Sequence, residues 1–350
     1  MNRVANWLPD NTAALVYTTV NRRYLTGFDS SLGYLVISRN EARLFVDGRY
    51  ILAAKQTVKN CEVELLGTKL CNVKAFVKGL GVKTLICEDS ISVAQLETFK
   101  KAFRGTKVTA KGGLSGLLSE LRSVKTDYEV DCIIKAQRIA EKAFLDVLNF
   151  IKVGVTEREV AAELEYRMKR FGSDNPAFDT IAVAGYKSAM PHGEPDDNVI
   201  KNGDFITMDF GATYNGYRSD MTRTVAVGHA TDKMQLVYNT VLEAQLATEK
   251  VVKSGAECAD VDKAARDVIS KAGFGEYFTH STGHGIGLQV HEAPTVSQLS
   301  KMTLKSGMII SDEPGIYIEN EFGVRIEDML LVTEDGSKNL TLAEKSLIIL

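Results

Sequence analysis

The chain is poor in the features that mark secreted, membrane-spanning and nucleic-acid-binding proteins. Its five cysteines, at positions 61, 71, 87, 132 and 258, form no CxxC pair or other metal-binding spacing, so we expect reduced thiols in a cytoplasmic protein. No apolar run approaches the roughly 18 residues of a membrane-spanning helix. The first residues, MNRVANWLPDN, lack the apolar segment of a signal peptide. A net charge of −3 gives no reason to expect nucleic acid or an anionic membrane as a partner.

Several common catalytic motifs are also missing or broken. No G-x-S-x-G nucleophile elbow occurs, which removes the main signature of the α/β serine hydrolases. The run from Gly283 to Leu288 has no third glycine for a dinucleotide-binding fingerprint. Pro294 breaks the helix that a zincin motif at His291-Glu292 would need. The chemistry of this chain must therefore lie in other residues.

The length of 350 residues can hold two domains of ordinary size. Residues 1–122 alternate apolar runs with helical stretches, which predicts an α/β domain. We expect strands at 34–37, 42–46, 62–66 and 83–87, and helices at 50–57 and 92–103. A glycine-rich stretch from Lys111, followed by LRSVKTDYE, marks the boundary, so residues 123–350 are predicted to form the second domain.

The second domain is predicted to contain two similar halves. Thr126 with Glu129, and Thr156 with Glu159, form capping boxes that open two helices, the second ending at Gly172. A hairpin follows at about 204–227. Two helices, at about 232–253 and 259–271, and a hairpin at about 308–332 repeat that order. We therefore predict an α+β domain with pseudo-twofold halves.

Five side chains able to bind metal stand in order in the second domain, within motifs dense in glycine, proline or aromatic residues. They are Asp209, Asp220, His284, Glu313 and Glu327. Four carboxylates and one imidazole make a hard, oxygen-rich set. That set suits two divalent ions bridged by carboxylates better than a structural zinc site, which prefers Cys and His. A two-metal centre usually serves hydrolysis.

Hairpin geometry is expected to bring the first two acids together. Asn215-Gly216 favours a two-residue type I′ turn between extended runs. That turn would pair Gly211 with Asp220. Because strand side chains alternate between faces, Asp209 would be the diagonal neighbour of Asp220.

The second hairpin is predicted to repeat this geometry. A five-residue loop, Glu319 to Gly323, would pair Gly315 with Glu327 and make Glu313 the diagonal neighbour of Glu327. Carboxylates gathered without partners repel each other and resist burial. Divalent cations would remove that penalty, which favours a metal site over scattered solvated acids.

The histidines gather in the same region of the sequence. His284 lies between two glycines, which let the backbone pass close to a site, and it would supply the nitrogen ligand. His192 and His291 lie in loops, where each alone would suit a hydrogen-bonded structural role. Because four of the five histidines fall in these loops, we expect these two to serve catalysis. His280 is expected to support the ligands, and His229 to be a surface residue.

The order Asp, Asp, His, Glu, Glu in these motifs resembles the pita-bread metallopeptidases, which include methionine aminopeptidase, aminopeptidase P and prolidase. The resemblance covers about residues 125–350. It implies that the five side chains bind two divalent ions, with Asp220 and Glu327 bridging them and Glu313 also shuttling a proton. Mn²⁺ or Co²⁺ would suit this mixed oxygen and nitrogen set, with Zn²⁺ as the alternative.

The resemblance also assigns residues around the metal ligands. His192 and His291 match the family's two substrate-facing histidines, and Phe178 resembles a residue that lines the substrate pocket. Arg325 looks like the arginine that precedes the last ligand, with backbone or neighbouring acids as its targets. His192, His291 and Glu313 are thus the expected catalytic residues.

The sequence of the first domain indicates which members of this family the chain resembles most. The segments NRRYLTG (21–27) and LFVDGRY (44–50) resemble the creatinase-type N-terminal domain of prolidases and aminopeptidases P, which methionine aminopeptidases generally lack. In those relatives this domain helps to close the active site, often from the other subunit, so we expect a homodimer. Two positions depart from the family pattern. Thr295 stands where many dipeptide-specific prolidases carry Arg, and Asp312 replaces a usually apolar residue and should face away from the metals.

These features predict a cytoplasmic Xaa-Pro aminopeptidase or Xaa-Pro dipeptidase, a metallo-exopeptidase that releases the residue preceding proline through a water activated by two metals. Because Thr295 offers no cation for a free carboxylate, we expect Xaa-Pro-Yaa tripeptides to be cleaved at least as well as Xaa-Pro dipeptides. The alternative is that Arg218, Lys187 or a residue of the other subunit supplies that cation. Three alternatives stay open: a methionine aminopeptidase-type activity, a metal-free creatinase-like hydrolase, and a non-catalytic peptide-binding protein.

Overall fold

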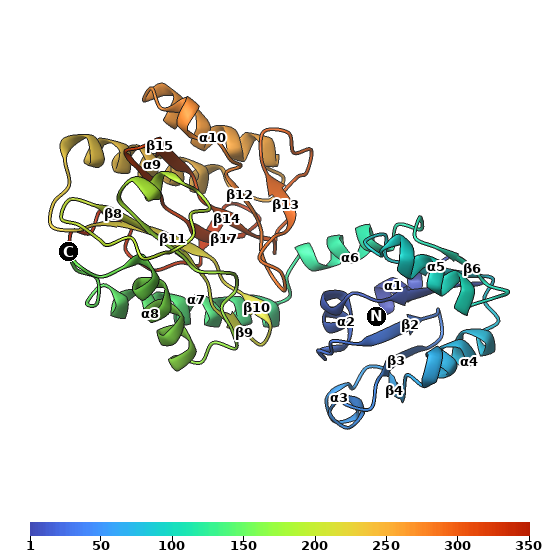
Figure 1. Ribbon diagram of the computed structural model, residues 1–350. Coiled ribbons are helices and arrows are strands. Elements are labelled where there is room, and N and C mark those ends of the chain that lie inside the picture. Colours follow the sequence, from blue (N-terminus) through green and yellow to red (C-terminus); the bar gives the residue numbers. More distant parts are fainter. The chain divides into compact units, whose positions relative to one another are not determined.

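The computed structural model describes residues 1–350. The contacts among its residues divide the chain into two units, Met1–Arg122 and Ser123–Leu350 (Figure 1). None of the helices in either unit combines the length and the hydropathy that a membrane crossing needs.

The first unit is built on a six-stranded mixed sheet in the order β4-β3-β2-β1-β5-β6. Its strands are β1 (Thr12–Val16), β2 (Gly33–Ile37), β3 (Ala42–Val46), β4 (Glu62–Leu65), β5 (Thr84–Cys87) and β6 (Lys107–Thr109). Its helices are α1 (Asn2–Trp7), α2 (Thr19–Thr26), α3 (Ile51–Thr57), α4 (Cys71–Gly79), α5 (Val93–Ala102) and α6 (Leu114–Ser123). The α/β class predicted for this region is therefore confirmed.

The central strand β1 was not predicted from the sequence. Its segment, TAALV, contains two alanines, which are poor strand formers by themselves. The strand is stabilised by its neighbours instead, because it pairs antiparallel with β2 and parallel with β5. Successive residues of β1 point to opposite faces of the sheet, and both faces are buried: Ala14 belongs to one apolar cluster and Leu15 to another.

The second unit opens with the two predicted capped helices, α7 (Asp127–Val147) and α8 (Glu157–Arg170). Both capping boxes are present: the side chain of Thr126 accepts from the amide of Glu129, and Thr156 does the same for Glu159. The helices pack on a three-stranded sheet in the order β11-β8-β7. This sheet is formed by β7 (Ile181–Ala184), β8 (Phe205–Phe210) and β11 (Met221–Ala226), with a small ribbon of β9 (Thr213–Tyr214) and β10 (Tyr217–Arg218).

The second half of this unit repeats the arrangement with α9 (Asp232–Val251) and α10 (Cys258–Lys271). Its five-stranded sheet has the order β13-β12-β14-β17-β18. The strands are β12 (Gly283–Gly285), β13 (Glu292–Val296), β14 (Ile309–Asp312), β17 (Asp328–Val332) and β18 (Ser337–Asn339), with a ribbon of β15 (Gly315–Ile318) and β16 (Phe322–Arg325). The predicted order of two helix–helix–hairpin halves is confirmed, although β7, β12 and β13 were not expected as separate strands.

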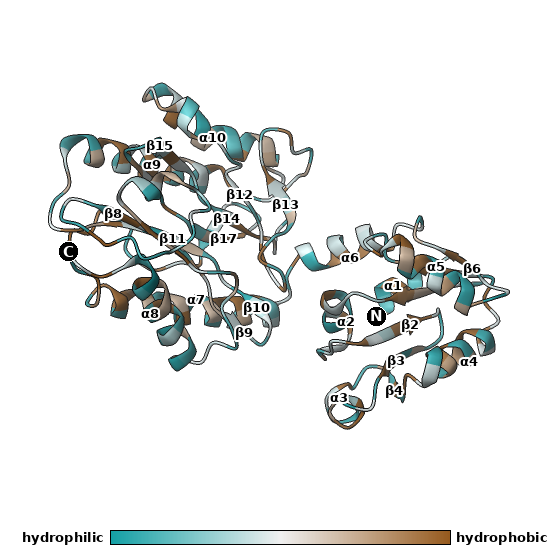
Figure 2. Ribbon diagram, in the orientation of Figure 1, coloured by the Kyte–Doolittle hydropathy of each residue, from teal (hydrophilic) through white to brown (hydrophobic).

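Each half has its own apolar core between helices and strands. Figure 2 shows hydrophobic residues along β8 and hydrophilic residues over much of α10. In the first half, Phe144 of α7 stacks on Phe210 of β8, with their ring centroids 6.3 Å apart. In the second half, α9 and α10 bury Val241 and Ile269 against the β15–β16 ribbon. The acidic residues of the predicted site lie on or beside the strands that these cores hold.

Candidate metal centre

The first hairpin places Asp209 and Asp220 as the sequence predicted. Asn215 and Gly216 both have positive φ, 47° and 75°, as a type I′ turn requires. Thr213 pairs with Arg218 in the ribbon, and Asp209 pairs with Thr222 in the β8–β11 ladder. One register therefore runs through the whole hairpin, and Asp220 is diagonal to Asp209.

Gly211 lets the two strands of this hairpin approach each other. A Cβ atom at Gly211 would lie 1.9 Å from the carbonyl oxygen of Ser219, so no other residue fits without moving the backbone. The strands that carry Asp209 and Asp220 are thus held closer than side chains at this position would allow.

The register predicted for the second hairpin was wrong by two residues. Ile318 pairs with Phe322, and Gly315 pairs with Arg325 rather than with Glu327. The loop contains three residues, because Asn320 takes the left-handed conformation with φ 60°. Gly323, which was expected in the loop, lies in β16, where a Cβ atom would stand 2.2 Å from the carbonyl oxygen of Ser188.

The corrected register changes the relation between the last two acids. In the neighbouring β14–β17 ladder, Asp312 pairs with Asp328. Glu313 directly follows Asp312, and Glu327 directly precedes Asp328, so Glu313 and Glu327 stand opposite each other rather than diagonally. Their backbones are fixed from elsewhere in the unit: the amide of Glu313 donates to Thr282 at 2.8 Å, and that of Glu327 donates to Thr222 at 3.1 Å.

His284 is presented by β12, which lies between β13 and β14 in the sheet (Figure 1). The glycines beside it make this close fit possible. A Cβ atom at Gly283 would lie 2.0 Å from Ser311 O, and one at Gly285 would lie 2.2 Å from Ala293 O. The amide of His284 donates to Ser311 Oγ at 3.0 Å. The two glycines therefore allow β12 to pack closely against its neighbouring strands, whereas the sequence had suggested a close approach to a site.

These elements bring the five predicted side chains into one cluster. One ligand atom from each of Asp220, His284 and Glu327 lies within 4.8 Å of the others. His284 Nε2 stands 3.7 Å from Asp220 Oδ2 and 3.2 Å from Glu313 Oε1. Asp209 lies close enough for its charge to raise the pKa of both Asp220 and Glu327.

The cluster holds more negative charge than its own cations offset. Burial, followed by the charge of Glu327, raises the pKa of Asp220 well above its usual range. Burial likewise raises the pKa of Glu327 well above its usual range, with the charge of Glu313 adding to the effect. Asp209 Oδ1 and Glu327 Oε1 are buried without any hydrogen-bond partner. Oxygen atoms left in this state fit divalent cations, which would both pair them and cancel their repulsion.

Glu313 forms the shorter of the two ion pairs that His284 makes within the cluster, the other being with Asp220. Burial opposes a charged Glu313, but the hydrogen bond and charge of His284 lower the pKa of Glu313 to about 2. The same contact with Glu313 outweighs burial and raises the pKa of His284. Ser311 Oγ also donates to Glu313 Oε1 at 3.0 Å. A metal ion bound by His284 would take the place of this proton, because an imidazole binds metal in its neutral form.

Arg325 supports the cluster from one side. It donates through Nη2 to Asp209 Oδ2 at 2.6 Å and through Nη1 to the hydroxyl of Tyr317 at 2.9 Å. His280 Nε2 lies 2.8 Å from the same hydroxyl. The expected targets of Arg325 and the supporting position of His280 agree with this network. Tyr317 was missed, although it shares the strand alternation of Glu313 and could have been found from it.

The other predicted site residues lie around this cluster. The ring of His291 is exposed, with its centroid 4.3 Å from that of His284. His192 is exposed, and a charge on it lowers the pKa of both His280 and His291, so it lies near them. Phe178 is half-buried and follows Ala177, whose amide donates to Gly211 O at 2.8 Å.

Three side chains were candidates for contact with the C-terminal end of a short peptide: Thr295, Arg218 and Lys187. Thr295 is exposed and pairs with His284 in the β12–β13 ladder, so its side chain stands beside that ligand. Arg218, half-buried, donates to Ala177 O. Lys187 is buried and pairs with Glu157 and Asp196. Both cations already have partners within the protein.

Comparison with known proteins gives two family matches. Residues 131–334 match metallopeptidase family M24, and residues 10–124 match the creatinase/prolidase N-terminal domain. The Xaa-Pro dipeptidase of Pyrococcus furiosus is 39% identical over 352 residues, which cover 99% of this chain and 99% of the relative.

Solved structures give the same result over both units. The Xaa-Pro dipeptidase from Bacillus anthracis matches with a TM-score of 0.93 and 41% identity, covering 97% of this chain and 95% of that chain. The X-Pro aminopeptidase from Thermotoga maritima matches with a TM-score of 0.92 and 37% identity, covering 97% of each chain.

Proposed function

The chain belongs to metallopeptidase family M24, with the pita-bread fold and a creatinase-type N-terminal domain, and from this premise we propose that it hydrolyses the bond between an N-terminal residue and a following proline. The observation that carries the proposal is the buried cluster of four acids and one histidine, in which Asp209 and Glu327 each keep an unpartnered oxygen. We place the catalytic function in residues 123–350 and assign residues 1–122 to the N-terminal domain.

We assign Asp209, Asp220, His284, Glu313 and Glu327 as the residues that would hold two divalent ions. When bound, the ions supply Lewis acidity, which lowers the pKa of water at the site toward neutrality. Mn²⁺ or Co²⁺ suits this set of oxygen and nitrogen donors, with Zn²⁺ as the alternative. The burial of Asp220 and Glu327 supports this assignment, because acids with so little exposure need a counter-charge.

Side chains of the protein transfer the proton and bind the scissile carbonyl group. Glu313 carries a proton from the attacking water to the proline nitrogen, which must become protonated to leave. His291, beside His284, and His192 donate hydrogen bonds to the scissile carbonyl oxygen as negative charge develops on it. The exposure of both rings supports contact with a substrate.

Recognition of proline cannot depend on an amide hydrogen bond at that residue, since a peptide-bonded proline nitrogen carries no hydrogen. The shape of the ring must be read instead, and we assign the half-buried Phe178 to that pocket. Apolar contact with an aromatic ring is the interaction that a pyrrolidine ring can make there.

Substrate length is expected to follow from Thr295. An Xaa-Pro dipeptide ends in a carboxylate next to the cut, and an arginine is the side chain that pairs with it best. Thr295 offers only a hydroxyl beside His284, and Lys187 is held by Glu157 and Asp196. We therefore propose that tripeptides with proline in second place are cleaved at least as well as the dipeptides.

The test is a comparison of kcat/KM for Ala-Pro, Ala-Pro-Ala and Met-Ala on one preparation supplied with Mn²⁺. We expect Ala-Pro-Ala to match or exceed Ala-Pro, and Met-Ala to be a poor substrate. A strong preference for Ala-Pro would contradict the argument from Thr295 while leaving proline specificity intact. Faster cleavage of Met-Ala than of either proline peptide would contradict the proposed function.

We further propose, from the family resemblance, that the protein is a homodimer in the cytoplasm. Sedimentation equilibrium would test the assembly state, and cell fractionation would test the location. Elemental analysis of protein purified without added metal would identify the native ion.

A further inference from the structure

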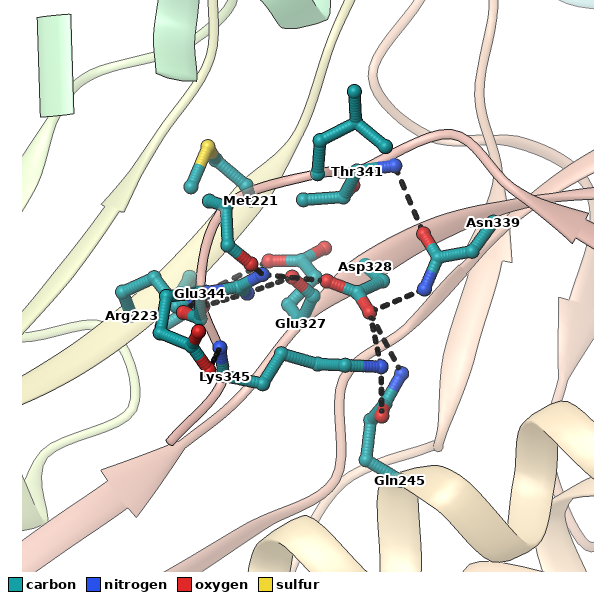
Figure 3. Close-up of polar contacts among 12 residues, drawn as sticks. Met221, Arg223, Gln245, Glu327, Asp328, Asn339, Thr341, Glu344 and Lys345 are labelled. Carbon is teal, nitrogen blue, oxygen red and sulfur yellow. Dashed lines mark hydrogen bonds and ion pairs between the residues drawn. The ribbon is translucent and has the colours of Figure 1, made fainter. Parts of the chain in front are cut away.

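The residue that follows the proposed ligand Glu327 belongs to a second polar cluster. Asp328 is fully buried and forms an ion pair with Arg223 at 2.7 Å, with both side chains 1% exposed or less. Its other carboxylate oxygen accepts from Lys345 Nζ at 2.8 Å, Asn339 Nδ2 at 2.6 Å and Gln245 Nε2 at 3.1 Å. Figure 3 shows these groups converging on Asp328.

Arg223 uses all five of its N–H donors in this region. Nη1 donates to the carbonyl oxygens of Glu327 at 2.6 Å and Thr222 at 2.9 Å. Nη2 donates to Asp328 and to Ala343 O, and Nε donates to Glu344 O at 2.8 Å. A guanidinium has five such hydrogens, so none is left for water or substrate. One side chain therefore joins the backbone of Glu327 to residues 343–344.

The backbone next to Arg223 also fixes the position of the Glu327 carboxylate. Thr222, the neighbour of Arg223, donates through Oγ1 to Glu327 Oε2 at 2.7 Å and accepts from the amide of Glu327 at 3.1 Å. Any shift of residues 222–223 against 327–328 would therefore move this carboxylate relative to Asp220. The position of a proposed ligand depends on the cluster behind it.

Lys345 holds the far side of the cluster. Besides Asp328, its ammonium reaches Gln245 Oε1 at 3.0 Å and Glu249 Oε2 at 3.3 Å, which accounts for its three donors. The ammonium therefore joins β17 to α9. A buried polar network with every member paired fixes geometry firmly, because any displacement leaves a charged group without its partner.

We infer that Arg223, Asp328 and Lys345 are positioning residues for the metal centre. They lie outside the proposed ligand set, and they act by holding the backbone at Glu327. The inference rests on the proposed function, since it assumes that Glu327 is a metal ligand. Partners outside the ligand set commonly change metal affinity by about 10–100-fold when removed.

The test is the affinity of folded, metal-free protein for Mn²⁺, measured by calorimetry at a temperature where circular dichroism shows each variant fully folded. We expect Lys345→Met to weaken binding at the Glu327 site about tenfold. Lys345→Arg, which keeps the charge, should remain within about threefold of the wild type. Arg223→Lys should weaken binding at least as much as Lys345→Met, because it removes the fork that spans Glu327 and Asp328.

The matched control is Lys233→Met, which breaks an exposed ion pair with Glu321 in the same unit and should leave the Mn²⁺ affinity unchanged. Wild-type affinity and stoichiometry in both Lys345→Met and Arg223→Lys would overturn the inference. Wild-type affinity in Lys345→Met alone would also overturn it for Lys345. A wild-type protein that binds no divalent ion would instead contradict the proposed function.

Discussion

Two acidic residues adjacent in the sequence, Glu327 and Asp328, stand in opposite electrostatic conditions. Glu327 is buried with one oxygen unpartnered, and burial together with the charge of Glu313 raises its pKa well above the usual range. Asp328 is also buried, but Arg223 and then Lys345 outweigh burial and lower its pKa. Burial is the same for both residues, so the difference lies in the counter-charges that the fold supplies.

The difference separates the proposed metal-binding cluster from a cluster with a structural role. Around Asp328 the protein supplies its own cations and leaves no donor of Arg223 unused. Around Glu327 it leaves carboxylate oxygens without partners, so their negative charge costs free energy until protons or bound cations neutralise it. Unpartnered buried oxygens also occur on Asp312, beside Asp328, so the proposed metal centre is distinguished by several such acids gathered around His284 rather than by any single one.

The largest expected effect is on the cluster around Glu327 when ions are removed. Dialysis against EDTA should abolish turnover of Ala-Pro-Ala, because no other nucleophile system is present. Turnover should return with Mn²⁺ or Co²⁺ but not with Mg²⁺ alone, which holds its waters tightly. Circular dichroism should change little, since the cluster around Asp328 contains its own cations. Full activity of the metal-free protein would show that the two clusters do not differ in this way.

Amide substitutions at the two adjacent acids should separate their roles. Glu327→Gln should lower kcat by about 10³-fold or more while leaving the ion-free protein at least as stable as the wild type, because a repelled charge is removed. Asp328→Asn should instead lower the free energy of unfolding by about 3–5 kcal/mol, because Arg223 and Lys345 lose their counter-ion. Steady-state kinetics and urea unfolding on both variants measure this, and equal effects of the two changes would refute the distinction.

Substitutions at the other proposed metal ligands should lower activity, as at Glu327, rather than stability, as at Asp328. His284→Ala and Glu313→Gln should each lower kcat by orders of magnitude. By contrast, His192→Ala and His291→Ala should lower kcat/KM by about 10²–10³-fold, as the loss of a donor to a developing oxyanion does. Metal content measured by elemental analysis should stay at the wild-type level in the two exposed histidine variants. Wild-type kcat/KM in both would remove these histidines from the site.

The smallest expected effect is a pH dependence of ion-induced stabilisation. The pKa values of Asp220 and Glu327 are raised in the ion-free fold, so their contribution to stability is present at low pH and is lost as pH rises through those values. The pKa of Asp328 is lowered, so its contribution is constant above about pH 5. Mn²⁺ should therefore raise Tm more at pH 7.5 than at pH 5.5, by several degrees. Thermal scans at both pH values measure this, and a larger gain at pH 5.5 would contradict it.

Much of the first half of the site could be predicted from local sequence rules. Asn215-Gly216 determines a two-residue turn, and that turn sets the register that makes Asp209 and Asp220 neighbours. The capping boxes at Thr126 and Thr156 likewise begin helices as expected. These features depend on residues close together in the sequence, so a single chain contains the information needed.

The register of the second hairpin could not be predicted from neighbouring residues. Asn320 closes its loop, whereas Gly323 is required by the carbonyl oxygen of Ser188, a residue more than 100 positions earlier. Asp312 was rightly expected to face away from the ligands, since it pairs with Asp328 in the β14–β17 ladder. Its two oxygens have no hydrogen-bond partner, and burial followed by the charge of Asp328 raises its pKa well above the usual range. Contacts of this kind become visible only when distant segments are placed together.

The glycines beside the ligands have a consequence for directed evolution. At Gly211, Gly283 and Gly285 an added Cβ atom would lie 1.9–2.2 Å from a backbone carbonyl oxygen, so any side chain there moves a ligand strand. A mutant library should therefore lose variants at these positions about as completely as at the ligands themselves. We expect useful diversity to enter at Thr295 instead, because its side chain is exposed beside His284. Substrate preference should therefore evolve through exposed residues around the cluster, because the glycines that position its strands cannot be replaced.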